Sequence, residues 1–280
     1  MYYGNKDIRL EDEWPLPVVG PGEARLSNLY TSICATDIEE WQYGPLYVSH
    51  GNPNPVSGRI MPLVLGHEAA GRIEELGEGV SNVAVGDRVS VRNIQTCGRC
   101  YWCRKDETSV CPDMAVFGLS ADGGLAQYAT WPADHMIKLP DNISNEEAPL
   151  IEPTTVAVHG VLRSGASSRD SVAVVGCGTV GLLAIQVLKS VDARVIAVDV
   201  RQESMTMASK FGADLVIDAS SGHLSEKLRD VTNGVGPDIV IETAGAEMTP
   251  VKAIECVRRR GKVVLVGIYS ATPRFDFNSI

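Results

Sequence analysis

Residues 171–199 read SVAVVGCGTVGLLAIQVLKSVDARVIAVD, and this stretch decides the fold of the second half of the chain. It opens with the apolar run Ser171–Val175, which is typical of a strand buried in a parallel sheet. A G-x-G-x-x-G pattern follows, and apolar residues then recur at helical spacing. Arg194–Val198 is a second apolar run, with Asp199 at its end. This order of strand, glycine turn, helix and strand predicts a dinucleotide-binding βαβ unit.

Each glycine of the pattern has its own predicted role. Gly176 permits the tight turn out of the strand, Gly178 lets the backbone approach a pyrophosphate, and Gly181 lets the helix pack closely on the strand. The pyrophosphate is expected at the positive N-terminus of the helix, beside its first residues, Thr179 and Val180.

The end of the second strand predicts which dinucleotide binds. Asp199 follows the last glycine by 199 − 181 = 18 residues, close to the roughly 20 expected of an acid that binds the adenosine ribose. A carboxylate there accepts hydrogen bonds from the 2′-hydroxyl and repels a 2′-phosphate, so NAD is expected rather than NADP. Arg201 is also expected at the cofactor site, where a cation would instead favour NADP. The alternative is a glycine-rich turn in an α/β protein that binds no ligand.

Composition narrows the class of protein. A chain of 280 residues allows one large or two ordinary domains. The net charge of −10 and the lack of a basic patch argue against nucleic acid as a partner. No apolar run approaches the ~20 residues that span a bilayer. The N-terminus lacks the apolar core of a signal peptide, so no membrane association and a cytoplasmic location are expected.

The two halves of the chain differ in pattern. Residues 1–150 alternate short β-type runs with Gly, Pro and Asn turns, which predicts a mostly β domain with a long loop over residues 43–61. Its strands are expected at Ala24–Ile33, Ala70–Leu76, Arg88–Val91 and Leu125–Thr130.

Residues 151–280 alternate helices and strands, which predicts a doubly wound parallel sheet of five strands. Beyond the first two strands, we expect strands at Asp214–Ile217, Asp238–Glu242 and Lys262–Gly267. Helices are expected near Thr154–Arg163, Thr179–Ser190, Glu203–Phe211, Leu224–Thr232 and Thr249–Arg259.

Four of the seven cysteines lie within fifteen residues, at Cys97, Cys100, Cys103 and Cys111. Two C-x-x-C steps place three thiolates on one tight loop, and the fourth can complete a tetrahedron. Four thiolates with no open position are typical of a structural zinc site. An iron–sulfur cluster is the alternative, and paired disulfides are less favoured in a reducing compartment.

A second group of ligand-type residues is dispersed along the chain, at Cys34, His67, Glu68 and Glu152. Each has an ordinary structural explanation when taken alone: a small buried hydrophobe for the cysteine, a hydrogen-bonded core residue for the histidine, a helix N-terminal charge for Glu152. Together they offer one thiolate, one imidazole and two carboxylates. That mixture suits a catalytic zinc site with an open position.

With these motifs in this order, the chain resembles the zinc-dependent medium-chain alcohol dehydrogenase family over nearly its whole length. The matching pieces are Cys34-Ala-Thr36-Asp37, Gly66-His67-Glu68, Val85-Gly-Asp-Arg-Val89, the four-cysteine cluster, Gly123-Gly-Leu-Ala-Gln-Tyr128, Glu152-Pro153 and the glycine pattern. Glu152-Pro153 is similar to the polyol, butanediol and threonine dehydrogenases, and the loop from Gly44 to Gly58 is most similar to the butanediol branch.

The resemblance implies a GroES-like catalytic domain over residues 1–150, joined to an NAD-binding Rossmann domain over residues 151–280, with the active site in the cleft between them. It also implies NAD-dependent oxidation of a secondary alcohol, vicinal diol or polyol to the ketone, in a dimer or tetramer.

The resemblance further implies two zinc ions per chain. Cys34, His67 and Glu68 would hold a catalytic zinc, with Glu152 as a fourth ligand or reaching the metal through water. Thr36 would accept the substrate proton. The four-cysteine cluster would hold the structural zinc.

Two departures from the family pattern bear on activity. Glu39, with Glu40 beside it, stands where the family often has a histidine of the proton relay, so an altered relay is expected. Family members also continue past residue 280, so the resemblance implies a Rossmann sheet truncated at its C-terminal side and an incomplete substrate pocket.

Other functions compete with this interpretation. One is a threonine dehydrogenase, and another is an inert zinc- and nucleotide-binding protein. A zinc-free quinone or enoyl reductase is a third, against which His67-Glu68 and the cysteines argue. A zinc-ribbon nucleic-acid binder is opposed by the net charge of −10.

Overall fold

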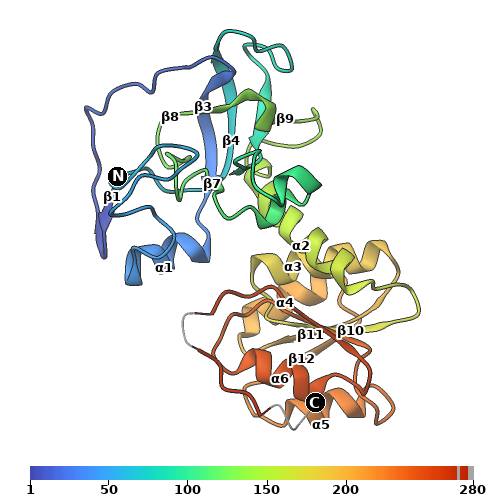
Figure 1. Cartoon of the computed structure of the whole chain (residues 1–280). Helices are drawn as coiled ribbons and strands as arrows, with labels where there is room; N and C mark the ends of the chain where they lie inside the picture. The colour runs from blue at the N-terminus through green and yellow to red at the C-terminus, as the bar shows by residue number, and fades with distance from the viewer. Residues whose placement is uncertain (270–271, 277–280) are drawn as a thin grey trace. The chain divides into compact units, whose positions relative to one another are not determined.

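The computed structural model describes residues 1–269 and 272–276. The chain divides into two compact units, Met1–Glu152 and Pro153–Ile280 (Figure 1). The first unit is mostly β and the second is a parallel α/β sheet, which confirms the predicted fold class. Among the helices that the described residues form, none is long and apolar enough to cross a membrane.

The first unit is built on an antiparallel sheet in the order β8-β3-β4-β5-β9. Its strands are β3 (Glu23–Ser32), β4 (Glu68–Leu76), β5 (Arg88–Val91), β8 (Tyr128–Pro132) and β9 (Met136–Lys138). Two short hairpins accompany it, β1 (Tyr2–Gly4) with β2 (Asp7–Ile8) and β6 (Ile94–Gln95) with β7 (Ala115–Val116). Residues 44–61 hold no helix or strand, as predicted.

One predicted strand begins later than expected. The sequence predicted a strand over Leu125–Thr130, but β8 begins at Tyr128. The reason is that the backbone N–H groups of residues 123–125 donate to the carbonyls of Val64, Gly66 and Leu65. This segment is therefore tied to the approach to β4, and its backbone first bonds to that of β3 at Gln127, whose carbonyl accepts the N–H of Asn28.

The first unit also contains one α-helix that the sequence analysis did not predict. Helix α1 (Ala35–Tyr43) buries the polar residues Thr36, Asp37 and Glu40. Short 3₁₀ helices lie at Cys103–Lys105, Thr108–Val110, Ala133–His135 and Ala148–Leu150.

The second unit contains the five-stranded parallel sheet, in the order β12-β11-β10-β13-β14. The strands are β10 (Ser171–Val175), β11 (Arg194–Asp199), β12 (Leu215–Asp218), β13 (Ile239–Glu242) and β14 (Lys262–Leu265). The helices are α2 (Ile151–Ser164), which begins at the end of the first unit, α3 (Thr179–Ser190), α4 (Gln202–Lys210), α5 (Leu224–Asp230) and α6 (Thr249–Cys256). The chain order reverses between β10 and β13, as in doubly wound sheets.

Alternation along β10 explains why both faces of this sheet are covered. Val172 and Val174 pack into one apolar cluster, whereas Ala173 and Val175 pack into another on the opposite face. Helix α6 ends three residues before the predicted Arg259 because Val257 is extended and the N–H of Arg258 donates to Pro237 instead of continuing the helix.

Candidate active site

The four-cysteine cluster is assembled within the first unit. The sulfurs of Cys97, Cys100, Cys103 and Cys111 all lie within 4.8 Å of one another. Individual separations are 3.5 Å for Cys97–Cys111, 3.9 Å for Cys100–Cys111 and 4.0 Å for Cys97–Cys103. A tetrahedral zinc with ordinary bonds to sulfur needs sulfurs about 3.8 Å apart, so the spacing matches a metal cage rather than disulfides.

Backbone groups support thiolates in this cluster. The N–H of Cys97 donates to the Cys111 sulfur and the N–H of Cys103 donates to the Cys100 sulfur. The backbone N–H of Arg99 donates to the sulfur of Cys97, and this interaction lowers the pKa of that thiol to about 7. The N–H of Cys97 lowers the pKa of the Cys111 thiol, but burial and the thiols of Cys97 and Cys103 outweigh it and raise that pKa to about 11. Because the thiolate is the form that binds metal, Cys97 is the thiol of this pair better prepared for a cation.

The dispersed residues Cys34, His67 and Glu68 also come together, with their ligand atoms within 4.8 Å of one another. The register of β3 against β4 explains the meeting, because Ser32 pairs with Glu68. Cys34 lies two residues after the end of β3, and His67 directly precedes β4. His67 and Glu68 are buried, and Cys34 is half-buried.

Asp37, for which no role was predicted, holds Cys34 by a hydrogen bond and lies beside His67, whose buried Nδ1 makes no hydrogen bond to any residue that the structure describes. Its carboxylate accepts the N–H of Cys34 at 2.9 Å, and its Oδ1 lies 3.5 Å from Nδ1 of His67. Burial lowers the pKa of His67, but the carboxylate of Asp37 and the thiol of Cys34 outweigh it and raise the pKa to about 10. The sequence position of Asp37 could have indicated its contact with Cys34. Asp37 is three residues after Cys34, where it completes a capping box for α1.

Two hydroxyls border the cluster. Ser32 donates a hydrogen bond to Oε2 of Glu68, which orients that carboxylate. Thr36 is buried, and its Oγ1 lies 3.6 Å from the Cys34 sulfur. The structure therefore brings the predicted hydroxyl next to the predicted thiolate.

Glu152 lies outside the group of three whose ligand atoms cluster, but it interacts electrostatically with His67 and Glu68. Its Oε1 accepts a hydrogen bond from Nδ2 of Asn93 at 2.8 Å. Partial burial raises the pKa of the Glu152 carboxyl. His67 and Asn93 act in the opposite direction, but their effect is smaller, so the pKa stays above its usual value. Asn93 was missed because a single asparagine between two short strands carries no local signal.

The acidic pair on α1 divides into two roles. Glu40 is fully buried, and its carboxylate accepts the N–H groups of Leu46 and Tyr47 at 2.8–3.1 Å, so it fixes the loop after α1. Glu39 is half-buried, and desolvation raises the pKa of its carboxyl. Of the two, Glu39 is the better placed to exchange a proton.

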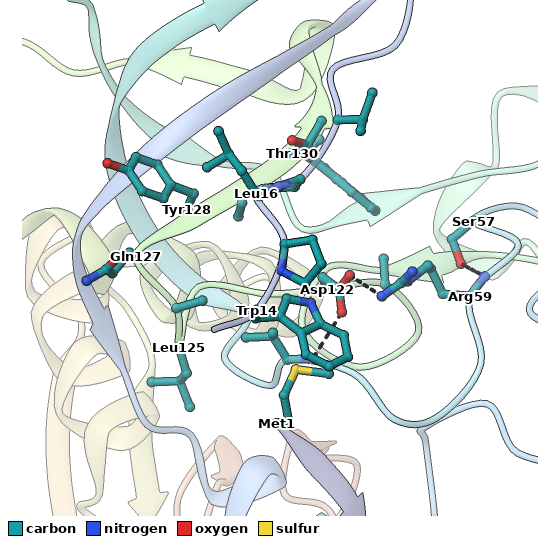
Figure 2. Close-up of a pocket in the computed structure, with 18 of the residues that line it drawn as sticks. Met1, Trp14, Leu16, Ser57, Arg59, Asp122, Leu125, Gln127, Tyr128 and Thr130 are labelled. Carbon is teal, nitrogen blue, oxygen red and sulfur yellow. Dashed lines mark hydrogen bonds and ion pairs between the residues drawn. The ribbon is translucent and has the colours of Figure 1, made fainter. Parts of the chain in front are cut away.

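A separate cavity of about 920 Å³ lies in the first unit, and none of the predicted ligand residues lines it. Figure 2 shows Trp14 and Leu16 of the N-terminal arm on one side, with Leu125, Gln127 and Tyr128 on the other. Arg59 and Asp122 form an ion pair in its wall. The cavity is large but contains none of the predicted metal ligands, so the candidate active site is the cluster of ligand atoms from Cys34, His67 and Glu68.

In the second unit, two of the three pattern glycines are required by the protein itself. Gly176 has φ +93°, and a Cβ there would lie 2.7 Å from the backbone of Ala244. A Cβ on Gly181 would lie 1.9 Å from the carbonyl oxygen of Gly176. A Cβ on Gly178 would meet no atom within 4 Å, and this glycine lies just before Thr179, the first residue of α3, with Val180 next. The space beside Gly178 is therefore open at a helix N-terminus, where anions bind.

Asp199 is already hydrogen-bonded to the backbone around the glycine turn. Its Oδ2 accepts the N–H of Cys177 at 2.6 Å, and its Oδ1 accepts those of Val200 and Arg201 at 2.8 Å. The Arg201 side chain is 64% exposed, with Nε 3.6 Å from Asp199 Oδ1. A carboxylate has about four acceptor sites, so Asp199 keeps capacity for a ligand hydroxyl.

Comparison with known proteins accounts for both units. Residues 20–141 match the alcohol dehydrogenase GroES-like domain family, and residues 179–280 match the zinc-binding dehydrogenase family. The chain is 37% identical to L-threonine 3-dehydrogenase of Pyrococcus horikoshii over 96% of its own length and 75% of that protein. It is 32% identical to (R,R)-butanediol dehydrogenase of Bacillus subtilis, over 100% of its own length and 80% of the relative.

Solved structures are similar over the same range. The crystal structure of 2R,3R-butanediol dehydrogenase from Bacillus subtilis has a TM-score of 0.89 and 31% identity, covering 100% of this chain and 79% of that one. An alcohol dehydrogenase of Escherichia coli complexed with NADH (TM-score 0.83, 31% identity, 95% and 74% covered) is also similar. So is a zinc-binding dehydrogenase of Sinorhizobium meliloti bound to NADP (TM-score 0.85, 27% identity, 95% and 75% covered).

Proposed function

The chain belongs to the zinc-dependent medium-chain alcohol dehydrogenase family, and we propose that it oxidises a secondary alcohol, vicinal diol or polyol to the ketone with NAD. The family is one of NAD(P)-linked oxidoreductases. The observation that carries the proposal is the approach of the Cys34, His67 and Glu68 ligand atoms within 4.8 Å. Butanediol and polyols are the first substrates to test, because the relatives include butanediol and sorbitol dehydrogenases of Bacillus subtilis.

Zinc fits this cluster by the chemistry of its ligands. A thiolate, an imidazole and a carboxylate are ligand types of catalytic zinc sites that keep one position open. Asp37 faces Nδ1 of His67, as carboxylates commonly do behind metal-binding histidines, and this leaves Nε2 for the metal. When bound, zinc supplies a Lewis acid that polarises the substrate oxygen and makes its hydroxyl more acidic.

The chain's own residues then handle the proton. In this proposal the hydroxyl of Thr36 accepts the proton that the substrate hydroxyl releases and at the same time gives up its own proton. Thr36 and Glu39 are three residues apart on α1 and therefore neighbours on its surface. Because desolvation raises the pKa of the Glu39 carboxyl, it can receive the proton next and return it to solvent.

Glu152 has a supporting role in this proposal. Its carboxylate is held by Asn93 and interacts electrostatically with His67 and Glu68, so it adds negative charge beside the cation. Either direct or water-mediated contact with zinc is compatible with that role.

For the cofactor we propose NAD in preference to NADP. NAD, when bound, supplies the hydride acceptor. Gly176, Gly178 and the start of α3 would receive the pyrophosphate, and Asp199 would accept the ribose hydroxyls. Asp199 is buried and already holds the turn, whereas the Arg201 side chain is mostly exposed, and this contrast favours NAD.

The second proposed zinc occupies the four-cysteine cluster, which would make two ions per chain. A cytoplasmic location and a dimer or tetramer are part of the same proposal. The four-cysteine cluster supports a cytoplasmic location, because cysteine thiols remain reduced in that compartment.

Threonine oxidation is the second candidate function. It is favoured by the 37% identity to a Pyrococcus L-threonine 3-dehydrogenase. A catalytically inert zinc- and nucleotide-binding protein is the third.

Metal content and turnover test the proposal together. We expect two zinc ions per chain in chelator-washed protein, one in His67→Asn and one in Cys103→Ser. Activity with NAD should appear on butanediol or sorbitol and fall at least about 1,000-fold in His67→Asn. Reduction of NAD with threonine alone would select the second candidate. The inert protein would be indicated by three results together. The wild-type chain would hold one zinc, this zinc would remain in His67→Asn, and the cofactor would bind without turnover of any alcohol.

A further inference from the structure

Glu242 is a fully buried carboxyl group to which the proposed function assigns no role. It is the last residue of β13, has 0% of its surface exposed, and lies at the carboxyl edge of the parallel sheet. β13 pairs there with β10, at the point where the strand order reverses. In doubly wound sheets this point opens the crevice that holds a dinucleotide.

One carboxylate oxygen of Glu242 holds the loop that follows its own strand. Oε1 accepts the N–H of Ala244 at 2.8 Å, the N–H of Gly245 at 3.0 Å and the hydroxyl of Thr249 at 2.7 Å. Thr249 is the first residue of α6, so this oxygen spans the whole connection from β13 to α6.

The other oxygen holds the loop that follows the neighbouring strand. Oε2 accepts a hydrogen bond from the hydroxyl of Tyr269, four residues after β14. A Cβ on Gly267 would lie 2.6 Å from Oε2, so this loop is packed directly against the carboxylate. Burial and the nearby Glu242 raise the pKa of Tyr269, which keeps its hydroxyl protonated and donating.

The first of these loops is also tied to the glycine turn. The hydroxyl of Thr243 donates to the carbonyl of Gly176 at 2.7 Å. With Asp199 on the far side of β10, the adenosine half of a dinucleotide belongs over β10 and β11. The rest of the molecule then extends across the switch point, toward the loops after β13 and β14.

We propose that Glu242 is a positioning residue that fixes these two loops in the conformation that receives the nicotinamide half of the cofactor. The inference rests on the proposed dinucleotide binding. Its physical reason is that one buried carboxyl group accepts four hydrogen bonds from the two loops, in a place where no water can replace a lost acceptor. Glu242 acts through the loops and does not itself contact the cofactor.

Glu242→Gln tests the inference in the full chain. Glutamine keeps the volume and one acceptor oxygen but replaces the other oxygen with an NH₂ donor. Dissociation constants are measured for NADH, for ADP-ribose and for AMP. We expect the constant for NADH to rise about tenfold, while those for ADP-ribose and AMP stay within about twofold of wild type. Glu255→Gln, on the exposed side of α6, is the matched control and should change none of them.

Equal weakening of NADH and AMP would overturn the inference, because it would indicate a general loss of structure. An unchanged NADH constant would overturn it as well. Tyr269→Phe removes a single hydrogen-bond donor, so the dissociation constant for NADH should rise by a smaller factor and that for AMP should stay unchanged. If Glu242→Gln does not fold, the result for Tyr269→Phe alone tests the inference. If the wild-type chain binds neither NADH nor AMP, the proposed function is wrong and the inference is overturned with it.

Discussion

The first unit forms its candidate metal site from side chains, whereas the second forms its candidate pyrophosphate site from backbone. Cys34, His67 and Glu68 offer ligand atoms that other side chains orient. At the glycine turn the useful feature is space for a ligand beside Gly178 and the N–H groups of a helix end. The contrast teaches that a side-chain site can be lost while the fold persists, but a backbone site depends on the fold that shapes it.

Two alanine substitutions in the glycine turn should produce the largest change in stability, and they test whether this site depends on the backbone. Gly176→Ala should destabilise the second unit by about 3–5 kcal/mol, because φ is +93° and the new Cβ would overlap Ala244. Gly178→Ala should change stability by less than about 0.5 kcal/mol yet weaken NADH binding, because its Cβ would point into open space. Urea unfolding and NADH titration measure both.

In each variant the zinc of the four-cysteine cluster should be retained, since that cluster lies in the other unit. Equal stability of the two variants would contradict the distinction between a glycine that the protein needs and one that the ligand needs.

Asp37→Asn should show an intermediate effect and sharpen the comparison within the first unit. Loss of a carboxylate behind a metal-binding histidine costs about 10–100-fold in metal affinity, and Asp37 faces His67 at 3.5 Å. Zinc affinity measured by chelator competition should fall by that factor at this site alone. Asp134→Asn is the matched control, because Asp134 faces His135, which is in neither cysteine-containing cluster. Unchanged affinity in Asp37→Asn would show that Cys34, His67 and Glu68 need no such support.

Asp238→Asn should show the smallest effect, and the size of that effect depends on pH. Burial raises the pKa of Asp238, but hydrogen bonds from Ser171 and Arg258 outweigh it, so the pKa is below its ordinary 3.8. The ionised form therefore stabilises the fold above pH 3.8, and this contribution is lost as the pH falls through the lower folded pKa.

We expect Asp238→Asn to lower the free energy of unfolding by about 1–2 kcal/mol at pH 7. The difference from wild type in urea unfolding should shrink as the pH falls below 3.8 and through the lower folded pKa of Asp238, below which both chains carry a neutral group. A difference that is constant with pH would mean that the carboxylate's charge plays no part.

The sequence predicted the second unit well because its signals are local. Each strand is a short apolar run, and β10 and β11 flank a glycine pattern whose spacing fixes their order. The ends were less accurate: α6 stops at Cys256 because Arg258 bonds to a distant carbonyl, which no local pattern reveals.

Helix α1 was missed for the opposite reason. It buries Thr36, Asp37 and Glu40 and leaves Ile38 and Trp41 partly exposed, so its hydrophobic pattern is inverted. That inversion arises because the buried polar groups contact the cluster of Cys34, His67 and Glu68 and the following loop. Asp37 was visible in the motif, but its contact with His67 depends on long-range pairing of β3 with β4.

The double use of Asp199 has a consequence for protein engineering. The same carboxylate joins Cys177 of the glycine turn to the start of the next loop and is the proposed contact of the cofactor ribose. An attempt to convert the enzyme to NADP by replacing Asp199 with a side chain that has no acceptor would therefore also release three backbone N–H groups. A successful redesign must supply other acceptors for these N–H groups. Cofactor preference and the conformation of the glycine turn therefore have to be redesigned together.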